Sequence, residues 1–187
     1  MKSTLRYLSL AMLTFAAVGL TSDVQAAEGT PLQVGDKLTM TAPADWKTKP
    51  PAVNFIEYEF ETPVAEGDPK PGRVTVMGAA GGVEANVARW EGQFKPEGDA
   101  AEVKAKVEQK TIAGQKVHIV DIKGIYIDKA GPFVPGPGTE RSGYRMLGAI
   151  IQSEGGGDYF VKMYGPEKTM AAAEPGFKAM IEGLKAK

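Results

Sequence analysis

The chain has 187 residues, a formal net charge of −1 and no cysteine. Its 22 basic and 23 acidic residues are interspersed, which disfavours nucleic acid and anionic membrane surfaces as partners. The lack of cysteine excludes disulfides and a lipid-modified N-terminal cysteine. Together with a single histidine, it also leaves too few of the ligands that zinc prefers.

The first 26 residues have the pattern of a secretory signal peptide. Lys2 and Arg6 precede an uncharged run at residues 7–20, and small residues surround the cleavage position after Ala26. The run has 14 residues, fewer than the roughly 20 that span a bilayer as a helix. We therefore predict an exported protein, periplasmic or extracellular, with no stable membrane insertion after cleavage. Residues 27–187 are then a single soluble domain.

The mature chain begins with a polar stretch at residues 28–36, which predicts a lead-in without regular structure. Residues 38–41 alternate between apolar and polar as a strand does, and a turn follows at residues 43–46. Residues 54–61 have the clearest strand pattern. Their apolar members are expected to be buried, while the three acidic ones are expected to face solvent, namely Glu57, Glu59 and Glu61.

A strand at residues 73–77 leads through a glycine-rich turn into an amphipathic helix that is predicted to continue to Phe94. Val83, Val87, Trp90 and Phe94 share one face of that helix, so Trp90 and Phe94 are expected to anchor it to a sheet. The glycines before the helix do not match a phosphate-binding loop, and tight-turn geometry explains them better.

The second half of the chain predicts two hairpins and a helix. Strands at residues 103–112 and 116–127 form the first hairpin, and residues 116–127 are apolar on both faces, as in a central strand. Strands at residues 144–152 and 158–164 form the second hairpin. A C-terminal helix is expected to open near Pro175, with an apolar stripe formed by Phe177, Met180, Ile181 and Leu184.

Residues 130–143 contain four glycines and three prolines and are predicted to lie outside regular structure. Phe133 and Arg141 in this loop are the candidate partner-binding residues, because apolar and arginine side chains at a loop tip are typical of interfaces. A tolerated insertion without function is the alternative explanation of the loop.

The sequence contains no recognisable catalytic motif, so we predict no catalytic residue, no cofactor and no metal site. His118 lies within the most apolar strand and is interpreted as structural. Ser142 and Ser153 are the serines that remain after the signal peptide, and neither lies in a nucleophile elbow.

The order of elements resembles the PsbP-like α/β/α sandwich. The residues that carry the resemblance are Pro43-Ala44-Asp45-Trp46, the helix at 82–94, the segment AGQKVHIVDIKGIYI, and YFVKMYGPEKTM with the helix that follows it. The same segments resemble exported bacterial proteins of planctomycete type that have no assigned activity. The resemblance implies an α+β fold, with a largely antiparallel sheet of about six to seven strands and helices packed on it.

PsbP-like domains act as accessory or partner-binding modules, so the resemblance favours a non-enzymatic binding or accessory module of the cell envelope. Its partner is an unknown envelope or extracellular protein or ligand. Two alternatives stay open. One is a small-molecule or lipid carrier, which needs a cavity between sheet and helix. The other is a hydrolase without a recognisable motif, which would use acids such as Asp45, Glu57 or Asp121.

The signal-peptide pattern makes the first testable prediction. Mass spectrometry of the protein recovered from the envelope or the medium should find Ala27 as its N-terminal residue. Recovery of the intact form beginning at Met1 would contradict the predicted cleavage.

Overall fold

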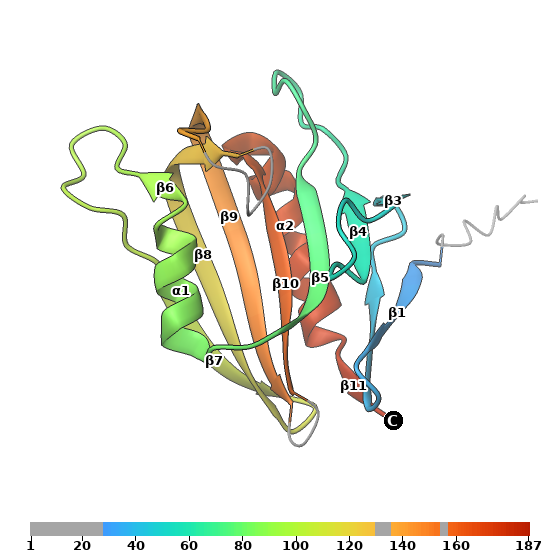
Figure 1. Ribbon diagram of the computed structural model, residues 1–187. Helices are drawn as coiled ribbons and strands as arrows, with labels where there is room; N and C mark the ends of the chain where they lie inside the picture. The colour runs from blue at the N-terminus through green and yellow to red at the C-terminus, as the bar shows by residue number, and fades with distance from the viewer. Residues whose placement is uncertain (1–27, 130–135, 154–156) are drawn as a thin grey trace, which may run out of the picture.

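The computed structural model describes residues 28–129, 136–153 and 157–187, so the predicted signal peptide lies outside the described residues (Figure 1). The two helices of the described part are α1 (Val83–Glu91) and α2 (Glu167–Glu182). Its strands are β1 (Thr30–Val34), β2 (Leu38–Ala42), β3 (Lys47–Lys49), β4 (Tyr58–Glu61), β5 (Arg73–Ala79), β6 (Phe94–Lys95), β7 (Lys106–Ile112), β8 (Gln115–Asp128), β9 (Thr139–Ser153), β10 (Gly157–Pro166) and β11 (Lys185–Ala186).

The main sheet is antiparallel and has eight strands, in the order β3-β4-β5-β10-β9-β8-β6, with β7 pairing to β8 on the same side as β6. The expected mixed, largely antiparallel fold is confirmed, but the expected six to seven strands were too few. Two of the strands that were not predicted are very short, since β3 has three residues and β6 has two. Such pieces carry no apolar periodicity that a sequence pattern could reveal.

A second, three-stranded sheet has the order β1-β2-β11. The prediction of an irregular lead-in at residues 28–36 was therefore wrong, because Thr30–Val34 pairs antiparallel with β2. Leu32 and Val34 are each only 1% exposed within it. Their burial depends on contact with α2 and the main sheet, which the local sequence does not indicate.

The main sheet is covered on both faces, as Figure 1 shows. One face packs against α2 and the small sheet, and Val117, Leu147 and Phe177 are among the buried residues of that cluster. The other face packs against α1, and Val120 and Ile122 belong to that second cluster. The prediction that the strand around residues 116–127 is buried on both faces is confirmed.

The two predicted hairpins both form. The turn between β7 and β8 is tighter than the expected three-residue connection, because Ala113 and Gly114 both have positive φ angles, of 50° and 77°. Two successive residues with positive φ are the signature of a type I′ turn, whose twist matches that of the paired strands.

Helix α1 is anchored to the main sheet by Trp90, whose side chain packs closely against the backbone of β9. Trp90 is 1% exposed and meets the ring of Phe160 edge-on, with centroids 5.2 Å apart. A Cβ atom at Gly148 would lie 2.5 Å from Trp90 Cζ3, so only glycine leaves room for the indole. The helix ends at Glu91, and the predicted anchor Phe94 lies in β6 instead, where it still packs into the same cluster.

Helix α2 starts eight residues before the predicted opening at Pro175, which is inside the helix. The cause is a contact from a distant loop. Asp68 Oδ2 accepts hydrogen bonds from the backbone N–H and the hydroxyl of Thr169, both at 2.7 Å, and so caps the first turn. Burial of Met170 and Phe177 then stabilises a helix that runs through the proline.

The packing of α1 makes a quantitative prediction. Trp90→Ala should lower the free energy of unfolding by about 3–5 kcal/mol, because it opens a large cavity against Gly148 and Phe160. Phe55→Ala is the matched control, because the Phe55 side chain is 49% exposed and its truncation should change stability little. Urea denaturation of both variants tests this expectation. Equal stability of the two variants would show that Trp90 does not anchor the helix.

Candidate functional site

Three adjacent strands each place a tyrosine on the α1 face of the sheet, near the point where α1 ends. Tyr126 of β8 stacks on Tyr144 of β9, with ring centroids 5.8 Å apart and planes 5° from parallel. Tyr126 also contacts the ring of Tyr164 of β10, at 4.8 Å. Phe94, just beyond α1, packs against Tyr126 from the other side, at 5.2 Å. The strand order of the sheet therefore creates an aromatic platform.

Cationic side chains surround this platform. The Lys162 ammonium lies 4.9 Å from the ring centroid of Tyr164, and the Lys70 ammonium lies 5.7 Å from that of Tyr144. Arg73 Nη1 donates a hydrogen bond to the Tyr164 hydroxyl at 3.1 Å. We call this group the tyrosine-cation cluster; it consists of Lys70, Arg73, Tyr126, Arg141, Tyr144, Lys162 and Tyr164.

Lys162 is the unusual member of the tyrosine-cation cluster, because it is only 8% exposed. Its ammonium donates to Gln93 Oε1, and no carboxylate among the described residues forms an ion pair with it. Burial, together with the nearby guanidinium groups of Arg89 and Arg73, lowers the pKa of Lys162 to about 7. Lys162 was not among the residues predicted from the sequence, although a lysine between Val161 and Met163 in an apolar strand is a readable signal.

Glu59 and Arg73 form a bidentate pair at the edge of the tyrosine-cation cluster. Arg73 Nε and Nη2 donate to the two carboxylate oxygens of Glu59, at 2.7 and 3.0 Å. The hydrogen bonds from Arg73 hold the pKa of Glu59 below its usual value. The expected solvent-facing position of Glu59 was therefore wrong, because the residue is 9% exposed and turned towards β5.

Of the two predicted partner-binding residues, Arg141 belongs to the tyrosine-cation cluster and Phe133 lies outside the described residues. Arg141 Nε donates to Asp128 Oδ2 at 3.3 Å, and Asp128 also pairs with Lys70 at 3.5 Å. The prediction of a loop up to residue 143 was wrong for residues 139–143, which belong to β9. Pairing with the long strand β8, where Arg141 lies opposite Tyr126, extends β9 over these residues.

The hydroxyl of Tyr144 is buried and has no hydrogen-bond partner within the part of the chain that the structure describes. Buried polar groups in folded proteins are nearly always hydrogen-bonded, and leaving one unpaired costs about 1–3 kcal/mol. Among the described residues, this hydroxyl is therefore an unpaired donor and acceptor, on a tyrosine whose ring faces the Lys70 ammonium.

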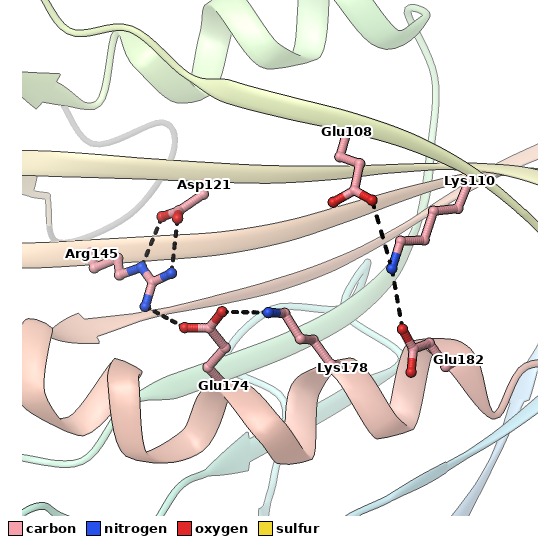
Figure 2. A network of polar contacts seen from close by, with 7 residues as sticks. All are labelled: Glu108, Lys110, Asp121, Arg145, Glu174, Lys178 and Glu182. Carbon is pink, nitrogen blue, oxygen red and sulfur yellow. Dashed lines mark hydrogen bonds and ion pairs between the residues drawn. The ribbon is translucent and has the colours of Figure 1, made fainter.

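A second polar network lies on the opposite face, between the sheet and α2 (Figure 2). Arg145 Nε and Nη2 donate to both oxygens of Asp121 at 2.8 Å, and Nη1 donates to Glu174 at 2.7 Å. Lys178 and Arg145 together lower the pKa of Glu174. Because its buried guanidinium has two carboxylate partners, we interpret this network as structural: it joins α2 to β8 and β9.

The buried side chains of α2 pack against those of the sheet. A cavity of about 20 Å³ lies beside Ile112, Ile119 and Ile181, which is room for a single water molecule. An open groove of about 590 Å³ lies elsewhere, along the segment between β6 and β7 and the edge of β8 at Lys123 and Gly124. Neither has the enclosed apolar lining that a lipid or small-molecule carrier needs.

Among the candidate hydrolytic residues, His118 and Ser142 lie far apart in the sheet. His118 Nε2 lies 3.1 Å from Gln152 Oε1, which supports the structural interpretation of the histidine. His118 pairs with Ile150, so Ser142 lies eight residues away along β9, which is about 26 Å at the rise of a strand. Among the described residues, no group of three potential metal ligands gathers.

Comparison with known proteins finds solved structures of similar fold. No protein-family model and no curated protein sequence matches this chain. Among solved structures, cyanobacterial PsbP (CyanoP) from Synechocystis sp. PCC 6803 has a TM-score of 0.51 at 10% identity, over 92% of this chain and 100% of that one. LpqN of Mycobacterium tuberculosis has a TM-score of 0.50 at 11% identity, over 86% of this chain and 91% of that one. The fold is thus similar to the PsbP-like fold.

The buried lysine makes a prediction about stability and pH. The folded amine of Lys162 loses its proton near pH 7 and the unfolded amine near 10.5, so between these values the unfolded chain binds more protons. The contribution of Lys162 to the free energy of unfolding therefore rises with pH across this window and is constant below it. Lys162→Met should abolish that rise, because methionine fills a similar volume without a charge.

Urea denaturation of the wild type at neutral pH and at about pH 9 measures this rise. Proton linkage predicts that the urea concentration at half-unfolding is higher at about pH 9. Lys168→Met, at an exposed position on α2, is the control and should keep the rise of the wild type. A pH profile of Lys162→Met that matches the wild type would show that the amine is solvated.

Proposed function

We propose that this chain is an exported, non-enzymatic accessory module of the cell envelope that binds an acidic partner through the tyrosine-cation cluster. The observation that carries the proposal is a local excess of positive charge on an aromatic platform. Lys70, Arg73 and Arg141 are cations at neutral pH, and the carboxylates paired with them are Glu59 and Asp128. Lys162, whose pKa is about 7, adds a partial positive charge. The whole chain, by contrast, has a net charge of −1.

The exposure of these residues suits an interface. The side chains of Lys70, Arg73 and Arg141 are 43%, 35% and 42% exposed, so they form an accessible rim. Tyr144 and Lys162 lie beneath them and are buried. Tyrosine and arginine are the residue types that most often dominate binding energy, and a cationic rim both attracts and orients an acidic partner.

Other observations are compatible with an envelope module. The signal-peptide pattern supports export, and the chain resembles exported proteins of planctomycete type. The LpqN structure is described as that of a protein involved in cell envelope biogenesis, which is compatible with the proposal, although its 11% identity supports only the shared fold. No helix in the described part of the chain combines the length and apolarity of a membrane span.

Affinity capture with charge-reversal variants tests the proposal. The mature protein, immobilised, should retain an acidic protein from its own envelope fraction. Lys70→Glu combined with Arg141→Glu should weaken that binding about tenfold or more, which corresponds to about 1.4 kcal/mol. The loss should be larger at low than at high salt, because exposed charges are screened.

Lys37→Glu combined with Lys185→Glu is the matched control, since it makes the same charge change at two exposed positions, Lys37 just before β2 and Lys185 in β11. This control should retain the partner.

The predicted partner-binding pair is tested in the same assay with Phe133→Ala and Arg141→Ala together, which should weaken capture without changing the melting temperature. The proposal fails if every protein retained by the wild type is also retained by the cluster variant.

A further inference from the structure

The two outer edges of the main sheet differ in how they are protected. Strand β3 at one edge has only three residues, two of them lysines, and short lysine-rich edges resist pairing with another chain. Strand β7 at the other edge has seven residues and, within the part of the chain that the structure describes, pairs only with β8. Its second edge therefore presents unpaired backbone groups to the surroundings.

The side chains of β7 are also accessible. Its first four residues are exposed, and Val107 is 45% exposed, which places it among the few large apolar side chains on the surface of the described residues. Because successive side chains of a strand alternate between faces, Val107 and Gln109 lie on one face, and Glu108 and Lys110 on the other. Lys110 reaches α2, where it pairs with Glu182 at 3.2 Å.

The geometry points to a second copy of this chain as the occupant of the β7 edge, in an antiparallel two-fold pairing centred on Gln109. Gln109 is the midpoint of β7, so this centring is the one that pairs all seven residues. It places Glu108 of each copy opposite Lys110 of the other. It also places Val107 opposite Thr111, so that the exposed apolar side chain is partly covered.

The neighbouring registers are worse because they oppose like charges. A two-fold axis at Glu108 would pair that residue with itself and Lys106 with Lys110, and an axis at Lys110 would pair the lysine with itself. Side chains directly opposite each other across antiparallel strands are about 4.5–5.5 Å apart, so opposite charges there stabilise the pairing and like charges destabilise it. The charge pattern of β7 is thus complementary to itself in the full-length register.

The contacts within one copy are compatible with this arrangement. Figure 2 shows Glu108 and Lys110 side by side on β7, with Lys110 between Glu108 and Glu182. The distance from Lys110 Nζ to Glu108 Oε1 is 3.8 Å, and the Glu108 side chain is 62% exposed. Each lysine can therefore be shared with the glutamate of the second copy, and four alternating charges then meet across the two-fold axis.

A single added strand pair buries little surface, so we expect a dimer that dissociates on dilution and weakens with salt. Sedimentation velocity of the mature protein over a range of concentrations should show a monomer-dimer equilibrium. Glu108→Lys and Lys110→Glu, each alone, should weaken the dimer about tenfold or more, since each opposes like charges twice across the axis.

The decisive experiment mixes the two single variants. A heterodimer of Glu108→Lys with Lys110→Glu again has opposite charges at both contacts, so mixing should restore dimers close to the wild-type level. Lys37→Glu is the control for a reversed exposed charge elsewhere and should dimerise like the wild type. Melting curves confirm that each variant is folded.

Three results overturn the inference. A wild-type protein that is monomeric at every concentration excludes the dimer. Single variants that dimerise as strongly as the wild type exclude β7 as the interface. Single variants that stay monomeric after mixing exclude the register centred on Gln109. None of these results depends on the tyrosine-cation cluster, so they leave the proposed function untouched.

Discussion

The central strands of the main sheet are apolar on both faces, and this property requires a cover on each side. Val117 and Val120, three residues apart on β8, are both fully buried but belong to different clusters. One face is covered by α2, which has 16 residues, together with the small sheet. The other face is covered by α1, with nine residues, and by the segment between β6 and β7, from which Val103 and Ala105 pack into the second cluster. Hydrophobic burial in these two clusters therefore determines the layers of the fold and also makes the two faces unequal.

That inequality explains where the tyrosine-cation cluster lies. A nine-residue helix is about 13 Å long, whereas the 15 residues of β9 extend over about 50 Å. Helix α1 thus cannot cover the whole face. Beyond its end the strands carry tyrosine, lysine and arginine, whereas the covered part carries aliphatic residues and Phe160. These amphipathic side chains shield the sheet with their apolar parts and present polar tips. The candidate binding surface is a consequence of the short helix.

Arg145 and Lys162, the two buried basic side chains among the described residues, differ in how their charge is stabilised. Arg145 has two carboxylate partners, so its network is complete and holds α2 on the sheet. Lys162 has an amide oxygen and two aromatic rings, which compensate an ammonium less well than a carboxylate does. The first arrangement joins α2 to the sheet, and the second leaves an amine whose protonated form a bound anionic group would stabilise. This difference makes the face of Lys162 the better candidate for binding an anionic group.

The sequence alone determined the features that arise from local periodicity. The stripe that includes Trp90, the two-sided strand around Val120 and the two hairpins were all predictable, because side chains three, four or two positions apart share a face whatever surrounds them. Only the tertiary structure decided which distant residues meet. Glu59 turned out to be a partner of Arg73, and Asp68 a cap for α2, because strand order and loop position bring them together. The tyrosine-cation cluster likewise depends on the adjacency of β8, β9 and β10. Local propensity is a property of short segments, whereas strand order follows from the packing of the whole chain.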